Sequence, residues 1–510
     1  MAKILWADDE IELLLPHVLF LKNKGHEVIT VQSGDEAVDK VKEEDFEIIF
    51  LDENMPGISG LDTLELIKAE KPSVPIIMIT KSEEEEIMDE AIGGRISDYL
   101  IKPVNPNQIL LAIKKNLEGK RLVNEKASSN YQQKFREISL DLQNRLDADE
   151  WADIYKRIVY WELQLDKTDQ SMQDILQMQK NEANQIFSKF VEKNYLNWLN
   201  IEGPLMSHQL LKHKVFPNVR NNKTFLIIID NLRYDQWLII RPLLSEMFTI
   251  KTEDLYYSIL PTATQYARNS IFSGMLPSEI KRKFPSKWKD ENDEGSKNQF
   301  EEDFLLYNLQ KNGLNLKTSY NKISNLSAGK KILNNFNNLL QNDFNVIVYN
   351  FVDMLSHART DMEVIRELAD DESAYRSLTL SWFKHSALYE MFQLIAENNL
   401  DVMITTDHGT IKVNEPSKVI GDRNTNANLR YKQGRNLNYK AKDVLAIKNP
   451  DEAFLPKSNI SSSYIFAKES KFFVYPNNYN HYVNYYKDTF QHGGISMEEI
   501  LIPFISLKAK

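Results

Sequence analysis

Short apolar runs alternate with amphipathic stretches over residues 1–118, which is the pattern of a parallel sheet with helices between its strands. Five runs predict strands: Lys3–Ala7, His26–Val31, Phe46–Leu51, Ile76–Ile79 and Asp98–Leu100. Helical periodicity falls between them, for example in Ser33–Glu43 and Gly60–Ala69. We therefore expect a doubly wound α/β domain whose functional loops lie at the carboxyl ends of the strands.

A purely helical pattern follows over residues 119–205. This segment has no proline before Pro204 and no glycine between Gly119 and Gly203. Apolar residues recur at helical spacing and predict buried faces: Ile154 and Ile158, Ile175 and Met178, Ile186 and Phe190. Breaks near Asp147 and Lys167–Asp169 predict three helices, which form an all-helical connector bundle. The tryptophans favour a helical core and leave a partner surface as the alternative: Trp151, Trp161 and Trp198.

Strand–helix alternation returns over residues 206–510, where continuous apolar runs predict parallel strands buried on both faces. The three strongest runs are Phe225–Ile229, Val346–Val352 and Asp401–Thr406, and weaker ones lie at Asp254–Ile259 and Tyr464–Phe466. The strong runs end in Asp230, Asp353 and Asp407. The pattern predicts a second, larger α/β domain with carboxylates at its strand ends.

Composition narrows the classes of function. At 510 residues the chain has room for roughly three domains. Its formal net charge of −11 argues against a protein that coats DNA, because such binding needs an excess of Lys and Arg. There is no cysteine, so disulfides, thiolate metal sites and cysteine nucleophiles are excluded, and any metal must bind to His, Asp, Glu or hydroxyl ligands. No signal-peptide pattern and no apolar run of roughly 18 residues is present, so we expect a cytoplasmic protein with no membrane partner.

Polar side chains follow the predicted strands of the first domain one after another. Acids follow the first and third strands, a hydroxyl the fourth and an ammonium the fifth: Asp8, Asp9, Glu10, Asp52, Thr80 and Lys102. Converging carboxylates repel one another and favour a hard divalent cation, most naturally Mg²⁺. The hydroxyl and the ammonium beside them complete a site for a phosphoryl group.

This constellation resembles the receiver domain of two-component response regulators, a CheY-like fold, over residues 1–118. The resemblance implies that Asp52, in FLDENMPG, accepts a phosphoryl group. The implied Mg²⁺ ligands are Asp8, Asp9, Asp52 and Asn54, and the implied switch residues are Thr80, Lys102 and Tyr99. The segment Gly93–Tyr99 (GGRISDY) is one residue longer than the family pattern, which affects the expected surface of the fourth helix.

Three of the nine histidines stand beside the carboxylates of the larger domain. His357 lies four residues after Asp353, so the two share one face if a helix begins there. His408 directly follows the acid at the third strand end, and His492 lies in QHGGISMEEILIP, where two glycines allow close backbone approach. The loop Pro261–Gly274 brings hydroxyls to a predicted helix start, where an anion is favoured. As a set, these residues favour a metal site over separate structural histidines.

The ordered motifs IIIDNLRYD, PTATQ, NFVDMLSH, TTDHG and HGGISMEEILIP resemble those of the PglZ domain of the alkaline phosphatase superfamily, over residues 206–510. The resemblance implies a two-metal centre, usually of zinc, with one ion held by Asp230, Thr264, Asp407 and His408 and the other by Asp353, His357 and His492. Thr264 takes the nucleophile position in preference to Thr262. Arg268 is a candidate for pairing with a substrate oxygen, with a surface arginine at a helix start as the alternative. Ligands of this type suit zinc or manganese, and their spacing does not separate the two.

Receiver, connector and PglZ domain in this order resemble response regulators of the PorX type over the full length. The resemblance implies a sensor histidine kinase as phosphodonor, a sigma factor as partner and a link to type IX secretion, and we expect phosphorylation to produce a homodimer. After TTDHG, the basic stretch Arg423–Lys440 is either a path for a phosphodiester backbone or a solvated insertion. The main hypothesis is a response regulator, controlled through Asp52, whose output is a metal-dependent phosphodiesterase acting on nucleotides or oligonucleotides. The alternative is a non-catalytic signalling adaptor that binds a sigma factor or another protein through its PglZ domain.

Overall fold

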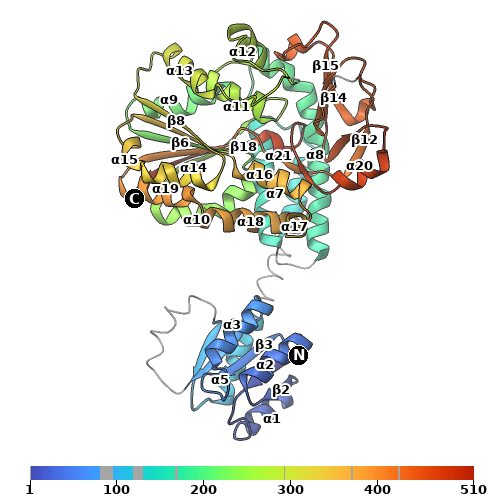
Figure 1. Cartoon of the computed structure of the whole chain (residues 1–510). Coiled ribbons are helices and arrows are strands. Elements are labelled where there is room, and N and C mark those ends of the chain that lie inside the picture. The colour runs from blue at the N-terminus through green and yellow to red at the C-terminus, as the bar shows by residue number, and fades with distance from the viewer. Residues whose placement is uncertain are drawn as a thin grey trace. The chain divides into compact units, whose positions relative to one another are not determined.

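A computed structural model of the chain describes residues 2–80, 96–118, 130–131, 133–166, 170–291, 293–368, 371–422 and 425–510 (Figure 1). These residues form two compact units, divided between Gln132 and Gln133. Three sequence expectations concern residues outside the described ranges: the insertion in GGRISDY with the fourth-helix surface, the start of the connector at residues 119–129, and the helix break at Lys167–Asp169. No helix in the described part of the chain is both long enough and apolar enough to span a bilayer.

The first unit is a five-stranded parallel sheet in the order β2-β1-β3-β4-β5. Its strands are β1 (Lys3–Ala7), β2 (Glu27–Val31), β3 (Ile48–Asp52), β4 (Ile76–Thr80) and β5 (Asp98–Ile101). Its helices are α1 (Leu15–Asn23), α2 (Gly34–Glu43), α3 (Gly60–Glu70) and α5 (Pro106–Ile113), which continues into η1 (Lys114–Glu118). Successive residues of β1 face opposite sides: Ile4 and Trp6 join the core of α1 and α5, whereas Leu5 and Ala7 join that of α2 and α3. This confirms the predicted doubly wound fold.

The strand order reverses between β1 and β3, which makes their carboxyl ends the switch point of the sheet. Asp8 directly follows β1, and Asp52 is the last residue of β3. Ligands of doubly wound folds bind at this point because the loops diverge there and leave a crevice. The fold therefore places the predicted phosphoacceptor where such a sheet is open.

In the second unit, residues 133–141 are helical and are followed by α7 (Ala148–Leu165) and α8 (Gln170–Asn200). A capping box starts α7 at the predicted break, because Asp147 Oδ1 accepts the Glu150 N–H and Glu150 Oε2 accepts the Asp147 N–H. Ile154 and Ile158 of α7 are buried, as predicted. Two of the tryptophans are buried as well, Trp151 and Trp161, in keeping with the core interpretation.

The predicted buried face of α8 is wrong in its first half. Ile175 is 37% exposed and Met178 is 71% exposed. The buried apolar side chains are instead Leu176, Ala183, Phe187, Val191 and Tyr195. The error has a physical cause: the same buried face also carries polar side chains, and apolar periodicity does not register them.

The sheet of the second unit has six strands in the order β7-β18-β10-β6-β9-β8. They are β6 (Thr224–Ile229), β7 (Phe248–Tyr257), β8 (Thr318–Ile323), β9 (Phe344–Tyr349), β10 (Asp401–Thr405) and β18 (Leu501–Ala509). Strands β10, β6, β9 and β8 run parallel, and β18 runs antiparallel to both β10 and β7. The carboxyl ends of β10, β6 and β9 are therefore neighbours at one edge.

Helices cover both faces of this sheet. They are α9 (Phe216–Val219), α10 (Tyr234–Met247), α11 (Thr264–Ser273), α12 (Pro277–Lys283), α13 (Glu301–Lys311), α14 (Leu326–Asn334), α15 (Phe336–Leu339), α16 (Phe351–Asp361), α17 (Glu363–Leu368), α18 (Glu372–Lys384) and α19 (Ala387–Glu397). In Figure 1, α10, α14 and α19 lie along one face and α11 and α13 along the other. Every residue of β6 is buried as a result.

Smaller strands and two short helices complete the unit after β10. They are β11 (Ile411–Lys412), β12 (Glu415–Lys418), β13 (Tyr431–Gly434), β14 (Val444–Ile447), β15 (Ser463–Ala467), β16 (Lys471–Val474), α20 (Tyr479–Tyr486), β17 (Phe490–Gln491) and α21 (Met497–Ile500). They pair as β11 with β17, β12 with β16, and β13-β15-β14.

The connector helices pack on this α/β part through buried polar contacts. Arg376 of α18 lies 2.9 Å from Glu162 Oε1 and 2.6 Å from Asp166 Oδ1, at the end of α7. The Tyr195 hydroxyl of α8 accepts the Leu260 N–H at 2.7 Å. Residues 133–205 and 206–510 therefore form one compact unit.

Candidate metal centres and phosphoacceptor site

Three acids and one lysine meet at the carboxyl ends of β1, β3 and β5. Oxygens of Asp8, Asp9 and Asp52 lie within 4.8 Å of one another. Lys102 Nζ lies 3.0 Å from Asp8 Oδ2 and 3.0 Å from Asp52 Oδ1. Burial raises the pKa of Asp52, although Lys102 opposes the shift. The arrangement has the oxygen donors that Mg²⁺ requires and a cation for a phosphoryl group.

The other residues predicted for the receiver site, Thr80, Tyr99 and Asn54, differ in burial and in their contacts. Thr80 is buried, and its hydroxyl donates to Glu53 Oε2 at 2.9 Å. Tyr99 is 41% exposed, so its ring is not buried under the sheet edge. Asn54 is exposed and follows Asp52 by two residues. Glu53 was not predicted as a site residue, because its only distinguishing feature in the sequence is its place beside the phosphoacceptor.

The first ligand group comprises Asp230, Asp407 and His408, at the ends of β6 and β10. All three are buried, and one donor atom of each lies within 4.8 Å of the others. His408 Nδ1 lies 3.1 Å from the Gly409 carbonyl oxygen, which leaves Nε2 free to act as a ligand atom. Thr264, the first residue of α11, places Oγ1 at 3.1 Å from His408 Nε2 and 3.4 Å from Asp230 Oδ1.

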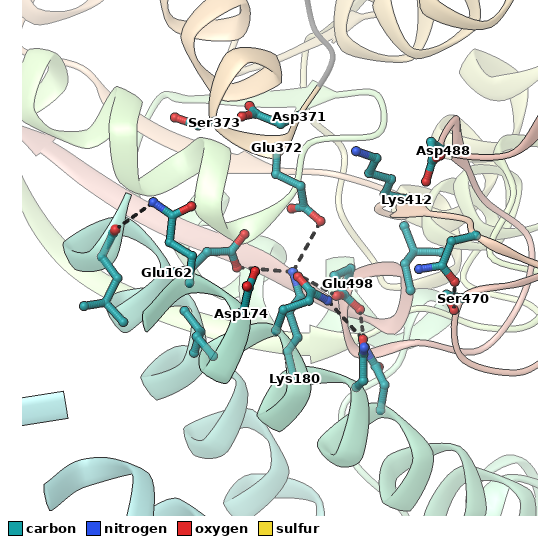
Figure 2. A pocket seen from close by; sticks show the side chains of 18 of the residues that line it. Glu162, Asp174, Lys180, Asp371, Glu372, Ser373, Lys412, Ser470, Asp488 and Glu498 are labelled. Carbon is teal, nitrogen blue, oxygen red and sulfur yellow. Dashed lines mark hydrogen bonds and ion pairs between the residues drawn. The ribbon is translucent and has the colours of Figure 1, made fainter. Parts of the chain in front are cut away.

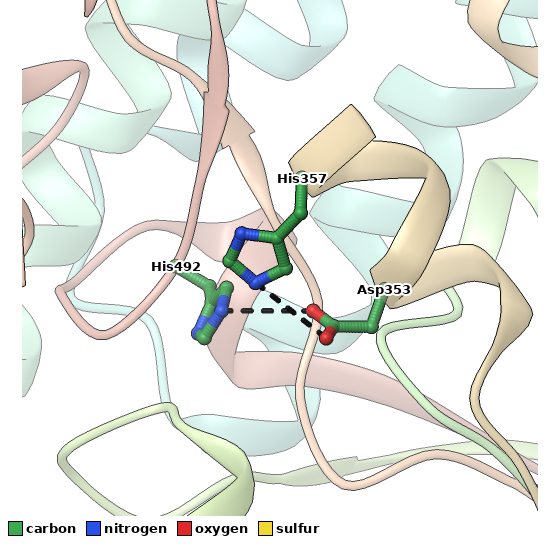
Figure 3. Close-up of side chains that lie close together, drawn as sticks. All are labelled: Asp353, His357 and His492. Atoms are coloured by element: carbon green, nitrogen blue, oxygen red, sulfur yellow. Dashed lines mark ion pairs between the residues drawn. The ribbon is translucent and has the colours of Figure 1, made fainter. Parts of the chain in front are cut away.

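The second ligand group comprises Asp353 and His357 of α16 and His492, which follows β17 (Figure 3). His357 Nε2 lies 3.6 Å from Asp353 Oδ2, and His492 Nε2 lies 3.7 Å from Asp353 Oδ1. Figure 3 shows both imidazoles directed at the carboxylate. The His492 Nδ1 atom contacts the Thr262 carbonyl oxygen at 3.1 Å, so Nε2 again faces the group. The His357 side chain is 62% exposed, which leaves this group open to solvent.

The two ligand groups lie side by side. The imidazoles of His408 and His492, one from each group, stack with ring centroids 4.2 Å apart. Asn231 bridges the groups, because its N–H donates to Asp407 Oδ1 and its Nδ2 donates to Asp353 Oδ1, both at 3.4 Å. It has a φ of 64°, a left-handed conformation that asparagine tolerates. Asn231 was missed as a site residue, although it stands within IIIDNLRYD.

Burial decides the protonation of these groups. It raises the pKa of Asp353 and raises that of Asp407 well above its usual range, in both cases helped by the charge of Asp230. It lowers the pKa of His408 to about 4 and that of His492 to about 3. Both imidazoles are therefore neutral at pH 7 and offer lone pairs. Asp407 Oδ2 is buried and has no hydrogen-bond partner among the described residues, and a divalent cation would satisfy it.

Arg268 is almost completely buried behind the first ligand group. Its Nη1 lies 2.6 Å from Asp230 Oδ2, and its Nε donates to Glu301 Oε1 at 2.6 Å. Burial acts to raise the pKa of Asp230, but Arg268 outweighs it, and the pKa is lowered. The surface alternative for Arg268 is wrong, and its pairing with a substrate oxygen stays a prediction. Glu301 carried no signal in the sequence, because it lies 33 residues away from its partner.

Thr262, the other threonine of PTAT, holds the loop that carries His492. Its hydroxyl accepts the Gly493 N–H at 3.0 Å and donates to the Gly494 carbonyl oxygen at 3.0 Å. Thr262 is fully buried. The two threonines therefore have separate positions: Thr264 faces the first ligand group, and Thr262 fixes the backbone beside the second.

The basic stretch after TTDHG is partly internal, which neither sequence interpretation anticipated. Arg430 is buried and lies 2.6 Å from Glu499 Oε2. Lys432 is also buried, donates to the Asn426 carbonyl oxygen at 2.9 Å and lies 4.4 Å from the centre of the Tyr475 ring. These two side chains are bound inside the fold around β13 and are not available to a phosphodiester backbone. Arg423 lies outside the described residues.

Comparisons with known proteins divide the chain in the order found from its motifs. Residues 4–114 match the response regulator receiver domain, and residues 121–199 match the PorX response regulator linker domain. Residues 210–507 match the BREX system PglZ alkaline phosphatase-like domain.

Individual relatives match the receiver. The chain is 33% identical over 112 residues to the transcriptional regulatory protein ResD of Bacillus subtilis, and 31% identical over 111 residues to the cell cycle transcriptional regulator CtrA of Caulobacter vibrioides. Each match covers 22% of this chain, 46% of ResD and 48% of CtrA, so the chain spans about half the length of these curated relatives. A CheY-like receiver domain protein from Methanospirillum hungatei, known from its crystal structure, is 28% identical, with 24% of this chain and 97% of that chain covered and a TM-score of 0.22.

The fold and the matches define a response regulator in which a receiver is joined through a helical linker to an alkaline phosphatase-like output domain. Receivers of this kind are phosphorylated by sensor kinases and bind Mg²⁺, and alkaline phosphatase-like domains bind metals. The PglZ match covers more than half of the chain, so the chain belongs to the PglZ family, in the receiver–linker–PglZ arrangement of PorX-type response regulators.

Proposed function

We propose that this chain is a response regulator phosphorylated on Asp52 whose PglZ domain is a dinuclear zinc phosphodiesterase acting on nucleotides or oligonucleotides. The observation that carries the proposal is the pair of adjacent ligand groups with the Thr264 hydroxyl at the first of them. A purely structural zinc site needs four ligands and no reactive group. Two neighbouring groups beside a hydroxyl are typical of two-metal phosphoryl transfer.

The donor set fits zinc, because it combines three carboxylates with three imidazoles, ligand types that zinc binds in proteins. One ion would be held by Asp230, Thr264, Asp407 and His408, and the other by Asp353, His357 and His492. Bound there, the ions would supply positive charge to the attacking and leaving oxygens. Manganese suits the same ligands and is the alternative ion.

Thr264 would provide the nucleophile. Its hydroxyl lies at the first residue of α11, where the unpaired backbone N–H groups of the helix favour a developing negative charge. His408 Nε2 lies 3.1 Å from the hydroxyl oxygen, so both atoms face the same ligand group. Attack of Oγ1 on phosphorus breaks the bond to one alcohol, which leaves with the proton of the threonine hydroxyl, and joins Thr264 to the phosphoryl group that still carries the other ester. Water then hydrolyses the bond between Oγ1 and phosphorus, which releases a phosphomonoester and restores the hydroxyl. The exposed His357 marks the side from which substrate enters.

The charge of the centre favours a diester over a monoester. With two divalent ions bound, the three ligand carboxylates leave one net positive charge at the two ligand groups. A phosphodiester carries one negative charge, whereas a phosphomonoester carries about −1.5 to −2 at pH 7. Arg268 would favour the more highly charged monoester, but its guanidinium is already bound by Asp230 and Glu301.

For the receiver, we propose that Mg²⁺ binds at Asp8, Asp9, Asp52 and Asn54 and that a sensor histidine kinase supplies the phosphoryl group. Thr80 and Lys102 would then meet the phosphoryl oxygens, and Tyr99 would move inward. From the resemblance of the whole chain to PorX-type response regulators we further propose a homodimer on phosphorylation, a link to type IX secretion, a sigma factor as partner and a cytoplasmic location.

The test compares turnover of bis-p-nitrophenyl phosphate and p-nitrophenyl phosphate by the zinc-loaded full chain. We expect zinc-dependent turnover with the diester preferred, and none from Thr264→Val. A protein that binds two ions and hydrolyses neither compound would contradict the catalytic proposal and support the adaptor alternative.

A further inference from the structure

A stripe of polar side chains on α8 faces the segment that follows His492. Lys180, Asn184 and Ser188, the α8 stripe, are spaced four residues apart and so share one face of the helix. They are buried, with exposed fractions of 4%, 3% and 0%. A buried polar group costs free energy unless it is paired, so the partners of the α8 stripe reveal what holds α8 in place.

Lys180 ties α8 to three other elements. It lies on the wall of a cavity of about 480 Å³ between the connector helices and the PglZ domain. Figure 2 shows its ammonium among three carboxylates: Nζ is 3.2 Å from Glu162 Oε2, 3.5 Å from Glu372 Oε1 and 3.2 Å from Glu498 Oε1. These acids belong to α7, α18 and α21, so one cation joins the connector to two helices of the PglZ domain.

Asn184 is hydrogen-bonded to α21 through both ends of its side-chain amide. Its Nδ2 donates to Glu498 Oε2 at 3.0 Å, and its Oδ1 accepts the Met497 N–H at 2.8 Å. One turn later, Ser188 Oγ donates to the Ile495 carbonyl oxygen at 3.4 Å. Three residues of one helix therefore hold the segment Ile495–Glu498, which begins three residues after His492.

The segment held by α8 is coupled to both histidine-bearing loops. Gly494 donates its N–H to Glu499 Oε1 at 2.8 Å, and Gly409 donates its N–H to the Glu499 carbonyl oxygen at 3.2 Å. A Cβ on Gly409 would lie 2.0 Å from the Glu498 carbonyl oxygen, so the backbones of Gly409 and Glu498 are in direct contact. Displacement of α21 would reach His492 most directly, because the chain between them is short.

We propose that the α8 stripe positions His492 for metal binding, so that displacement of α8 lowers the zinc affinity of the second ligand group. The inference rests on the function proposed above. It gives the linker a definite action: α8 is the element through which the preceding part of the chain can change the occupancy of one metal position.

The test removes one hydrogen bond between α8 and α21 and then restores it in the reverse direction. Asn184→Asp keeps the acceptor for the Met497 N–H but places a carboxylate oxygen against Glu498 Oε2. Adding Glu498→Gln restores a donor opposite that oxygen and returns the pair to its original net charge. Asn197→Asp, at an exposed position of the same helix, is the matched control. Zinc is titrated into the metal-free full chain, and the affinity of each of the two ions is measured.

We expect two tightly bound ions in the wild type and in Asn197→Asp. In Asn184→Asp one ion should bind at least about tenfold more weakly, and the Asn184→Asp/Glu498→Gln double variant should recover it. Recovery distinguishes positioning from general destabilisation, because the double variant carries more changes than the single one. Ser188→Ala, which removes only one hydroxyl, gives a milder form of the test with an expected loss of a few fold.

Two ions bound at wild-type affinity in both Asn184→Asp and Ser188→Ala would overturn the inference and leave the proposed function intact. So would a loss in Asn184→Asp that the double variant does not recover. A wild-type chain that takes up no zinc would overturn the proposed function and this inference together.

Discussion

Removal of the hydroxyl should have different effects at the two threonines of PTAT. Valine has nearly the shape of threonine, so Thr262→Val and Thr264→Val remove little but the hydroxyl. Thr262 Oγ1 is bonded to two backbone groups, the Gly493 N–H and the Gly494 carbonyl, both at 3.0 Å. Thr264 Oγ1 contacts only side chains among its described hydrogen-bond partners. The first change should therefore act on stability and the second on chemistry.

The magnitudes follow from these contacts. Thr262→Val leaves two buried backbone groups unpaired at about 1–3 kcal/mol each, so the unfolding free energy should fall by about 2–6 kcal/mol. Thr264→Val leaves no backbone group unpaired and should cost no more than about 1.5 kcal/mol. Loss of the nucleophile should lower turnover at least about 1,000-fold, which corresponds to roughly 4 kcal/mol of activation free energy.

Urea unfolding and diester turnover together separate the two outcomes. Six of the seven tryptophans lie in the second unit, so tryptophan fluorescence reports mainly on its unfolding. Thr262→Val should unfold at lower urea and retain turnover per folded molecule above that of Thr264→Val. The reverse pattern, a stable but inactive Thr262→Val and an active Thr264→Val, would show that Thr262 is the nucleophile.

Four further predictions address the metals, the receiver and two buried basic side chains. Elemental analysis should show that metal-free wild-type protein takes up two zinc ions. His408→Ala should lose one of these ions and His492→Ala the other. If the wild type takes up neither zinc nor manganese, the two-metal centre is refuted. Beryllofluoride with Mg²⁺ should convert a monomer to a dimer in light scattering while Asp52→Ala stays monomeric, and an unchanged wild-type mass would rule out this switch. Arg268→Met leaves Asp230 buried without its cation and leaves Glu301 with Lys322 as its remaining cation, 3.4 Å away, so the unfolding free energy of the metal-free protein, measured with urea, should fall by about 3–5 kcal/mol and that of the zinc-loaded protein by less. Equal losses would contradict the pairing of Arg268 with a proposed metal ligand. Burial lowers the pKa of Lys432 to about 7, so between pH 7 and about 10.4 the unfolded chain binds more protons and stability should rise with pH. Lys432→Met should remove that rise, and the same pH profile in both proteins would show that Lys432 stays charged when folded.

Strands that are buried along their whole length could be located from the sequence, although not always with the right bounds, and a partly exposed strand could not. The predicted Val346–Val352 starts inside β9 (Phe344–Tyr349) and runs on into α16, because the helix begins with the apolar residues Phe351 and Val352. The predicted Phe225–Ile229 differs from β6 by one residue, because every position of that strand is apolar or buried. Strand β7 spans Phe248–Tyr257, but only its second half was predicted, and the prediction ran on to Ile259. Its first half is exposed at several positions and contains charged residues, so no continuous apolar run marks it.

The candidate metal ligands could be found because their chemistry is local in the sequence, whereas their division into two groups came from the resemblance to the PglZ domain. A carboxylate after a buried strand, or a histidine four residues after an acid, can be found without knowing the neighbours. The position of Arg268 could not be predicted in this way, because it depends on Glu301, which belongs to another helix. The loop role of Thr262 likewise depends on residues more than 200 positions away.

The α8 stripe shows what apolar periodicity leaves out. On this helix Ala183 and Phe187 are buried, and each is followed directly by a buried polar residue, Asn184 and Ser188. An apolar face alone tolerates small shifts along its neighbour, since its contacts are not directional. Asn184 does not tolerate such a shift, because both ends of its amide are hydrogen-bonded. A shift of one residue would leave Glu498 Oε2 or the Met497 N–H unpaired. Polar residues repeated every four positions within a buried helix face therefore indicate a fixed docking register, and in this chain that register is set beside His492, a proposed metal ligand.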